Sequence, residues 1–466
     1  MFSSAARRLL SVGLLLLLLL SFVSCELRAT FPYGTTSGES APPPSGEELL
    51  SRIEASAGES RKSVRAWLSY WGFPSYDASV LRYMEMLFTN HYVGEIPDTD
   101  TIARELGYLF VEYMSYIDLT DPNEVTDLIM ECYLVAVGDR YAAYLNPEAL
   151  DAYAADVEGD FVGIGVHITY REDEEGPSCR IVRVFSGSPA KESGILPGDY
   201  LVAVNGCRYP EYDYAEMVDL VAGEVGSAVT ITVLRDGVEL TYTMERRKVV
   251  EETVEGWILP GPPTIGYIRI TEFDLTTYSQ FTETYERLIS LGATRIIFDV
   301  RDNPGGLLTA ILGVLDYLVP DGVTLARYEY YDGEVASDTA SDGHEIPSNL
   351  PIVVLTNQAT ISAGELFASA LKDFGQQGYL DVTLVGETTY GKGMMQTMIE
   401  LPGGRATTIS IAYYNPPYSD NYEGVGVIPD VFSSLSPEAQ EKDLFLLSDE
   451  EDAQLQRALS ILLGGG

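Results

Sequence analysis

The chain has 466 residues, which allows about three domains. Its composition, 46% hydrophobic and 11% aromatic, can fill real cores and excludes a disordered or collagen-like protein. The 29 basic and 70 acidic residues give a net charge of −41, so most of the surface would repel a nucleic-acid backbone. Three histidines without HExxH-like spacing and four cysteines without a CxxC pair give a zinc site no support.

The first 25 residues have the pattern of an export signal. Arg7 and Arg8 precede a leucine-dominated apolar run over residues 9–23. The run ends in Phe-Val-Ser-Cys, which resembles the lipobox of bacterial lipoproteins, where the cysteine is acylated. We therefore expect an exported protein, lipid-anchored through Cys25 at the extracytoplasmic face of the bacterial cell membrane. Ordinary cleavage and an uncleaved membrane anchor are the alternatives.

Composition shifts divide the rest of the chain. Residues 26–60 contain a Gly/Ser/Pro-rich stretch and are predicted to be a tether. Over residues 61–156, apolar residues recur every three to four positions, which predicts amphipathic helices. Short strand candidates separated by turns fill residues 157–250, namely Val162–Tyr170, Arg180–Phe185, Tyr200–Val204, Val229–Leu234 and Leu240–Met244, with a helix at Tyr214–Val221. In an oxidising exterior Cys132, Cys179 and Cys207 could pair, with Cys179–Cys207 as one option.

Residues 157–250 resemble a PDZ domain. The motifs that carry the resemblance are Gly163-Ile164-Gly165-Val166, Gly187-Ser188-Pro189-Ala190, Gly194-Ile195-Leu196-Pro197-Gly198-Asp199 and Val204-Asn205-Gly206. Successive N–H groups in such a glycine loop can hold a chain-terminal carboxylate while the peptide adds to the sheet edge. We therefore expect Gly163, Ile164, Gly165 and Val166 to bind a C-terminal tail, and His167 to line or flank the groove. The alternative is that these glycines only make turns.

Three elements after residue 250 carry candidate chemistry, within strands that alternate with helices and so indicate an α/β core. Pro304-Gly305-Gly306 stands between a buried strand and a helix, where free N–H groups suit an oxyanion. Ser362 follows a strand and precedes a helix, beside the N–H of Ala363. Lys392 lies between two glycines, where desolvation can lower its pKa and make it a general base. Taken singly, these are an ordinary turn, a helix cap and a surface charge.

The combination, in this order, resembles the C-terminal processing proteases, which are PDZ-bearing serine endopeptidases. The supporting motifs are Asn303-Pro304-Gly305-Gly306, Ser362-Ala363-Gly364-Glu365, Tyr390-Gly391-Lys392-Gly393 with Gln396, and Gly424-Val425-Gly426-Val427-Ile428-Pro429-Asp430, together with Asp139-Arg140-Tyr141-Ala142-Ala143-Tyr144-Leu145 before the PDZ segment. The resemblance implies an α/β, crotonase-like protease core of ββα units over residues 251–432. The PDZ-like domain precedes this core, and helical regions lie at the N terminus and over residues 433–466.

Residue roles also follow from the resemblance. Ser362 would be the nucleophile, Lys392 the general base, and Gln396 the residue that orients the lysine. Gly305, Gly306 and Ala363 would form the oxyanion hole, and Asp373 falls where the family has an aspartate sometimes assigned to a relay. The implied reaction is cleavage of unfolded C-terminal tails through an acyl-enzyme, with no metal or organic cofactor.

Two rival interpretations stay open. One is a surface-anchored PDZ receptor or adaptor whose core is inactive; the other is a histidine base, for which the core segment offers only His344. The interval from Ser362 to Lys392 is longer than is usual in the family, and we expect a surface loop over 375–381 to absorb the excess. The acidic helical pieces at both ends, including residues 449–463, fit either plain surface helices or a homodimer contact.

Overall fold

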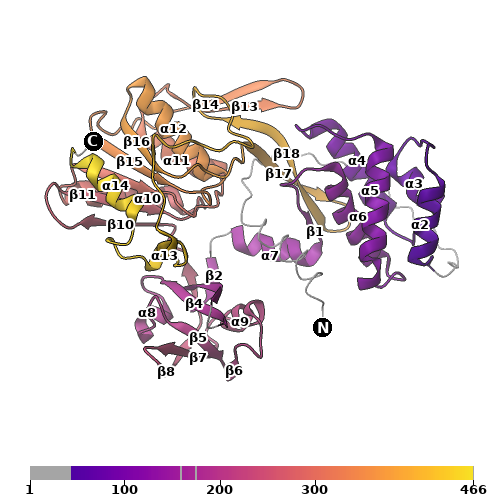
Figure 1. Ribbon diagram of the computed structural model, residues 1–466, viewed down its shortest axis with the longest axis horizontal. Helices are drawn as coiled ribbons and strands as arrows, with labels where there is room; N and C mark the ends of the chain where they lie inside the picture. The colour runs from indigo at the N-terminus through magenta and orange to yellow at the C-terminus, as the bar shows by residue number, and fades with distance from the viewer. Residues whose placement is uncertain (1–42, 158–159, 174–175, 465–466) are drawn as a thin grey trace.

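The computed structural model describes residues 43–157, 160–173 and 176–464. Figure 1 shows N-terminal helices at one end of the molecule, an α/β body at the other, and a small β-rich body beneath the latter. The predicted signal segment with Cys25 lies outside the described residues. Within the described ranges, no helix is long and apolar enough to cross a membrane.

The N-terminal region is helical, as its apolar periodicity predicts. Its helices are α2 (Gly46–Ala55), α3 (Val64–Trp71), α4 (Ala78–His91), α5 (Thr99–Tyr113), the 3-10 turn η2 (Met114–Tyr116), α6 (Pro122–Val137) and α7 (Pro147–Val157). Residues 46–55 were expected within the tether but form α2, because Ser45 and Glu48 make a capping box and Leu49 and Ile53 are fully buried. The buried face of these helices also meets Leu401 and Ile409 of the α/β body, so the two regions share a core.

The β-rich body contains a main sheet of order β3-β4-β5-β7-β8, with β6 beside β5, and a separate β2–β9 pair. Its elements are β2 (Asp160–Gly163), β3 (Val166–Asp173), β4 (Gly176–Val184), α8 (Pro189–Ser193), β5 (Tyr200–Val204), β6 (Cys207–Arg208), α9 (Tyr214–Val221), β7 (Ala228–Arg235), β8 (Val238–Glu245) and β9 (Arg247–Val250). The other predicted strands of this segment are present, but the predicted strand Val162–Tyr170 is divided between β2 and β3, because the chain turns at Ile164 and Gly165. The suggested Cys179–Cys207 disulfide is wrong: these cysteines and Cys132 are free thiols, and Cys132 and Cys179 are buried in different bodies.

The α/β body is built on a six-stranded sheet of order β10-β11-β12-β15-β16-β19, parallel apart from the β10–β11 pair. The strands are β10 (Val254–Leu259), β11 (Ile265–Ile270), β12 (Arg295–Asp299), β15 (Pro351–Thr356), β16 (Asp381–Gly386) and β19 (Val431–Phe432); the helices on one face are α10 (Thr277–Ser290), α11 (Leu308–Leu318) and α12 (Ala363–Gln377). α14 (Ala453–Leu462) covers the other face through Leu455, Ala458 and Leu462. Because helices cover both faces of this sheet, its central strands are apolar along almost their whole length. The predicted α/β class is confirmed.

A second sheet joins the α/β body to the N-terminal region, and the sequence did not indicate it. Its order is β1-β18-β13-β14, with β17 also paired to β18. These strands are β1 (Tyr144–Leu145), β13 (Thr324–Tyr330), β14 (Val335–Thr339), β17 (Met394–Leu401) and β18 (Arg405–Asn415). Because β1 pairs with β18, the residues just before β1 are held against the α/β body.

The expected surface loop over residues 375–381 is wrong. Residues 375–377 are the last turn of α12, Gly378 ends that helix in the left-handed conformation, and β16 begins at Asp381. Phe374 and Leu380 are buried and hold both ends of the short connection between α12 and β16.

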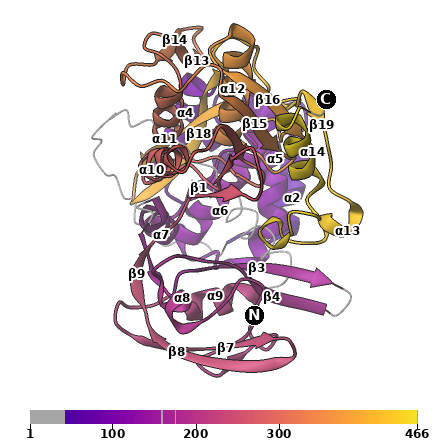
Figure 2. The same ribbon diagram turned by 90° about the vertical axis from the view of Figure 1, so that its left-hand side faces the viewer.

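The C-terminal segment crosses from the α/β body to the PDZ-like body. It contains α13 (Pro437–Gln440) and the 3-10 turn η3 (Leu444–Leu446), and Figure 2 shows α13 between the two bodies. The Phe445 ring lies between the guanidinium carbons of Arg183 (5.1 Å) and Arg269 (4.8 Å), one from each body. This segment therefore contributes to the joint between the bodies.

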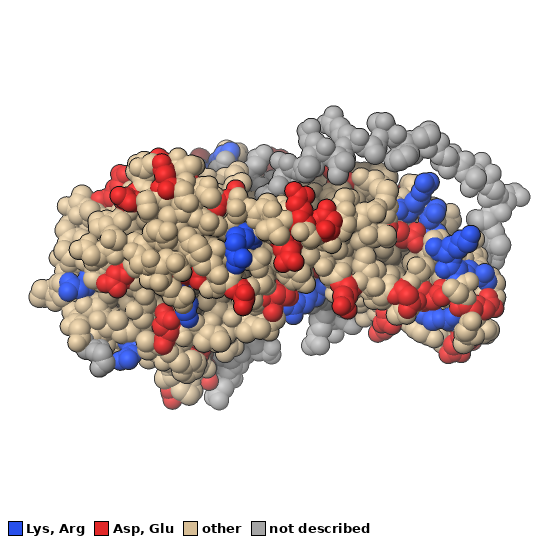
Figure 3. Space-filling model, turned by 90° about the horizontal axis from the view of Figure 1, so that it is seen from above, with Lys and Arg blue, Asp and Glu red and all other residues tan. Residues whose placement is uncertain are grey.

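Charge is unevenly spread over the face drawn in Figure 3. Acidic side chains run along the whole length of that face, whereas basic ones gather mainly at the end formed by the N-terminal helices. Among the residues that the figure colours, the basic side chains form no continuous track on this face, which agrees with the prediction of an acidic surface.

Candidate active site

Ser362 stands on a strained turn between β15 and α12. Its backbone has φ 54° and ψ −118°, a conformation that L-residues rarely adopt. Such a strand-to-helix turn projects a serine hydroxyl while leaving the next residues at a helix start. Ala363 is the first residue of α12, so its N–H has no partner within the helix. Ser362 is 2% exposed.

The Asn303-Pro304-Gly305-Gly306 turn lies directly against Ser362. A Cβ atom built on Gly305 would be 2.7 Å from the Ser362 Cβ and 3.0 Å from the Ala363 nitrogen. The Gly305 N–H donates to Asn303 Oδ1 at 2.8 Å, while Asn303 Nδ2 donates to the Ile270 carbonyl at 2.8 Å. Within the described part of the chain, the Gly306 and Ala363 N–H groups have no protein acceptor, and they are the two amides available to an oxyanion.

The Lys392 side chain is buried, with 1% exposure. Its Nζ donates to Gln396 Oε1 at 3.0 Å. Burial lowers the pKa of Lys392 to about 7, against the opposing effect of Asp139, Glu365 and Glu423. A substantial fraction of this amine is therefore neutral at neutral pH, as a general base requires.

The lysine turn is enclosed by the Gly424–Asp430 motif. Gly391 has φ 93°, and a Cβ there would lie 2.9 Å from the Gly426 nitrogen. The Gly424 N–H donates to the Gly391 carbonyl at 2.9 Å. The close approach of these two backbones accounts for the glycines in both segments.

Glu365 holds the serine and lysine segments together. Its Oε2 accepts from the Ser362 N–H at 2.9 Å and from the Lys392 N–H at 2.8 Å. Its Oε1 accepts from Thr389 Oγ1 at 2.5 Å and the Gly391 N–H at 2.6 Å. Burial raises the pKa of this carboxyl, whereas these four donors favour its ionised form. One fully buried carboxylate thus fixes the main chain at both candidate catalytic residues.

No individual role was predicted from the sequence for Glu365, Asn303 or Tyr141, although all three stand in the motifs named above, and Tyr414 lies outside those motifs. The spacing of Glu365 three residues after Ser362 is a helix-capping signal that could have identified it. Tyr414 donates to the Lys392 carbonyl at 2.8 Å and lies beside the Ser362 side chain. The contacts that Tyr141 and Tyr414 make at the site are long-range, so the sequence around each residue does not predict them.

Two other candidates have different surroundings. Asp373 is buried, and its carboxylate accepts from the Tyr418 and Ser419 N–H groups at 2.7 and 2.8 Å and from the Ser419 hydroxyl. Asp373 thereby links α12 to the loop that contains Tyr418 and Ser419. His344 has a side chain 59% exposed and stacks on Tyr317 with ring centroids 5.2 Å apart.

The PDZ candidates form a loop between β2 and β3. Gly163, Ile164 and Gly165 are buried, and Gly165 has φ 76°. The loop is held by main-chain bonds from Phe185 N to the Gly165 oxygen (3.0 Å) and from Ala190 N to the Ile164 oxygen (2.9 Å). His167 lies on β3 and is exposed.

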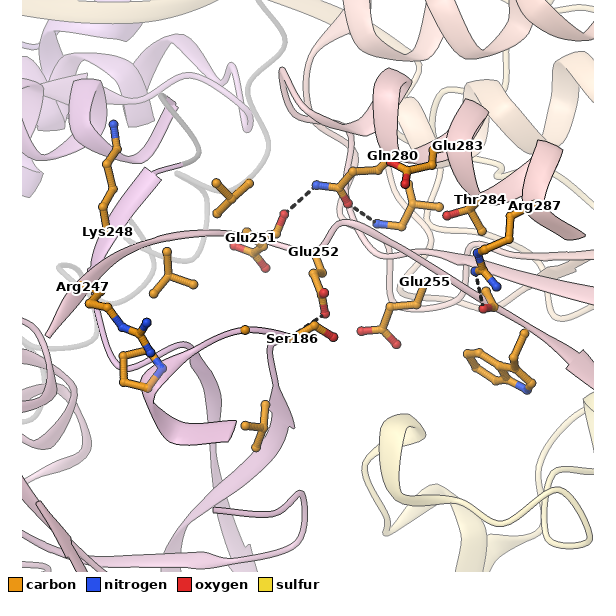
Figure 4. Close-up of a pocket in the computed structure, with 18 residues that line it drawn as sticks. Ser186, Arg247, Lys248, Glu251, Glu252, Glu255, Gln280, Glu283, Thr284 and Arg287 are labelled. Atoms are coloured by element: carbon orange, nitrogen blue, oxygen red, sulfur yellow. Dashed lines mark hydrogen bonds between the residues drawn. The ribbon is translucent and has the colours of Figure 1, made fainter. Parts of the chain in front are cut away.

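A cleft of about 770 Å³ lies at the joint between the PDZ-like and α/β bodies. Figure 4 shows that Ser186 of the first body, the β9–β10 connection and α10 line it, and that Glu252 reaches the Ser186 N–H. Beside it, the buried Arg183 side chain contacts Glu255 at 2.6 Å and Glu251 at 3.7 Å. Neither Ser362 nor Lys392 lines this cleft, which lies between the PDZ-like body and the α/β body.

Comparison with known proteins agrees with this arrangement. Residues 264–433 match the model of peptidase family S41, and residues 180–235 match that of the PDZ domain. The chain is 30% identical over 350 residues to a carboxyl-terminal-processing protease of Synechocystis, covering 74% of this chain and 78% of the relative. It is 31% identical over 328 residues to the chloroplastic C-terminal processing peptidase of Tetradesmus obliquus, covering 67% and 68%.

A solved structure shares the fold. The chain aligns with a putative S41 protease from Bacteroides fragilis with a TM-score of 0.57 at 17% identity, covering 84% of this chain and 99% of that one. At this identity the alignment shows the fold alone, which is the S41 protease fold.

Proposed function

Because this chain belongs to the carboxyl-terminal processing proteases of peptidase family S41, a family of serine-type peptidases, we propose that it cleaves protein C-terminal tails with a Ser362–Lys392 dyad. The observation that carries the proposal is the shared acceptor Glu365 Oε2, which binds the N–H groups of both residues. The burial of Lys392 and the pKa of about 7 that results support its role as the base.

The reaction would proceed in two stages. Neutral Lys392 takes the proton of the Ser362 hydroxyl as Oγ attacks the peptide carbonyl carbon, and the N–H groups of Gly306 and Ala363 stabilise the oxyanion. The Lys392 ammonium then gives the proton to the leaving amine as the peptide bond breaks, which leaves an acyl-enzyme on Ser362. Water, deprotonated by Lys392, attacks the ester carbonyl carbon; the bond to Oγ then breaks, the Lys392 ammonium returns the proton to Ser362, and the second product leaves as a carboxylic acid.

The PDZ loop would select the substrate. Its N–H groups suit the carboxylate of a tail, and the adjoining strand edge suits the extended chain before it. We also propose that an occupied PDZ domain activates the dyad. Removing residues 157–250 and finding unchanged cleavage of a short peptide would contradict that part.

The test is cleavage of an unfolded protein with an apolar free C terminus by the full chain. Ser362→Ala and Lys392→Met should each lose roughly a thousandfold or more in kcat/KM. The matched controls are Ser369→Ala, a buried serine on α12, and Lys372→Met, a partly exposed lysine that pairs with Asp430 at 3.0 Å. Both controls should stay within a few-fold of the original chain. Tail binding without cleavage in the original chain would favour the inactive receptor.

The base can be tested separately by pH. Since Lys392 must be neutral to act and its pKa is about 7, kcat/KM should rise with pH through a midpoint near 7. Below that midpoint the ammonium form accumulates and activity falls. An ascending limb near 10 would instead indicate a solvated lysine.

We further propose that the chain is exported and lipid-anchored at Cys25. The support is the order of features in the first 25 residues: two arginines, then an apolar run, then the sequence Phe-Val-Ser-Cys. Labelling cells with an alkyne fatty acid should mark the original protein and not Cys25→Ser. Equal labelling of both would overturn the lipid anchor and leave the protease proposal untouched.

A further inference from the structure

The wall of the lysine site includes a residue from outside the α/β body. Tyr141 follows α6 and precedes β1, about 250 residues before Lys392 in the chain. It is 3% exposed, and its ring centroid lies 5.0 Å from Lys392 Nζ. The N-terminal helical region therefore reaches the base itself.

The Tyr141 main chain determines the orientation of Gln396. Gln396 Nε2 donates to the Tyr141 carbonyl, and Gln396 Oε1 accepts from Lys392 Nζ at 3.0 Å. An amide side chain has one acceptor end and one donor end. Occupying the donor end with the Tyr141 carbonyl turns the acceptor toward the lysine, which fixes the direction of one lysine N–H.

The Tyr141 phenol is anchored beside both glycines of the lysine turn. Its hydroxyl donates to Glu423 Oε1 at 2.9 Å and lies 3.3 Å from the Gly391 carbonyl oxygen. Glu423 Oε2 accepts from the Gly393 N–H at 2.7 Å. The ring is thus held in place over the ammonium by a carboxylate that also holds the turn.

We propose that Tyr141 is a positioning residue for the Lys392 base, its ring excluding water from Nζ and its carbonyl setting the Gln396 amide. The inference rests on the proposed dyad and adds a requirement to it. Lys392 is correctly positioned only when the segment before β1, which contains Tyr141, packs against the α/β body. Residues matched by the S41 family model alone do not supply this wall.

The ring has two opposite effects on the lysine. Its face attracts a cation, which favours the ammonium form, and its bulk excludes water, which favours the neutral amine. Burial is the largest cause of the low lysine pKa, and the Tyr141 ring is part of the wall that buries Nζ, so we expect the second effect to dominate. The charged groups that face Nζ, namely Asp139, Glu365, Glu423 and Arg140, remain when only the ring is changed. Replacing the Tyr141 ring with a smaller side chain would admit water to Nζ and should therefore raise the pKa of Lys392.

The experiment measures kcat/KM against pH for full-length Tyr141→Leu and Tyr141→Phe, with an internally quenched peptide that ends in an apolar free C terminus. In Tyr141→Leu the ascending limb should move up by about one pH unit, which is about a tenfold loss below the limb. Tyr141→Phe keeps the ring, so its limb should stay while kcat falls a few-fold. Tyr141→Met, whose side chain is longer and more adaptable than that of leucine, replaces the leucine variant if that variant does not fold.

The matched control is Tyr133→Leu, which removes an equally buried tyrosine, 3% exposed, from the same helical region. It should lower the melting temperature without moving the limb. An unmoved limb in Tyr141→Leu would overturn the inference even if that variant were less stable. Retained activity in Ser362→Ala would instead overturn the dyad, so the two failures are distinguishable.

Discussion

Two glycine loops of this molecule are proposed to bind negative charge through backbone N–H groups, and they differ in the contacts that hold them. The Asn303–Gly306 turn is fixed by the Asn303 side chain, which bonds both the Gly305 N–H and the Ile270 carbonyl. The Gly163–Val166 loop is held by main-chain bonds to its neighbours at Gly165 and Ile164. The first loop would bind a charge that exists only during reaction, and the second a stable carboxylate.

The support beneath the catalytic turn extends into the core. Asp299 and Arg301 are fully buried and pair at 2.7 Å, and Arg301 also pairs with Asp452 at 2.7 Å. Burial raises the pKa of Asp299, but the Arg301 pair outweighs it and brings the value to about 2. Oxyanion donors stabilise a transition state only when they need no rearrangement. The turn proposed to bind the oxyanion is thus held by a buried side chain in addition to main-chain bonds, whereas the loop proposed to bind the tail is held by main-chain bonds.

Outside the proposed dyad, the largest expected effect is at Gly306. With φ 123°, a Cβ at this position would lie 2.1 Å from the Phe273 carbonyl oxygen, so the turn must move. Gly306→Ala should lower kcat by roughly a hundredfold to a thousandfold, about 2.7–4 kcal/mol, which is the usual cost of losing one oxyanion donor. Single-turnover rates measure the loss directly.

Gly322→Ala is the matched control for Gly306→Ala. Gly322 also has positive φ, 86°, but nothing lies within 4 Å of its Cβ position. Both variants therefore carry backbone strain from a positive φ. Only in Gly306→Ala does the added methyl group clash with a neighbouring backbone, that of Phe273. Equal activity of the two variants would argue against an oxyanion role for this turn.

The next effect concerns the buried support. Asp452→Ala removes a carboxylate that accepts from Arg301 at 2.8 and 2.7 Å and caps α14 through the Leu455 N–H at 2.9 Å. The Arg301 charge would stay buried with one partner fewer, which should lower the free energy of unfolding by about 3–5 kcal/mol. Urea unfolding gives the value. Asp449→Ala, at an exposed aspartate just before α14, should change it by less than about 0.5 kcal/mol.

How far the sequence predicts the molecule depends on the range of the interactions. Tyr200–Val204 and Tyr214–Val221 match β5 and α9 residue for residue, because local patterning and an Asp213 cap define them. The second sheet escaped prediction, since β1 and β18 pair across more than 250 residues. At the site, Ser362 and Lys392 stand in recognisable turns. Glu365, Tyr141 and Tyr414 act through contacts that only the folded chain creates.

A smaller effect is expected at the recognition loop. A Cβ on Gly165, at φ 76°, would lie 2.3 Å from the Ser188 Cβ. Gly165→Ala should raise KM for a tail-bearing protein by about tenfold, the equivalent of one lost charge-assisted hydrogen bond. Gly187→Ala is the control, with φ 66° and open space at its Cβ position. A purely kcat effect in Gly165→Ala would contradict the assignment of this loop to recognition.

The smallest effect is expected at His344, and it decides between the two candidate bases, His344 and Lys392. His344 lies 3.6 Å from Asp342 on an exposed loop, whereas Lys392 shares the Glu365 carboxylate with Ser362. His344→Ala should therefore leave both kcat/KM and the limb unchanged. Suppose instead that His344→Ala loses the ascending limb of the pH profile and Lys392→Met retains it. The histidine would then be the base, and the buried lysine would have no part in the reaction.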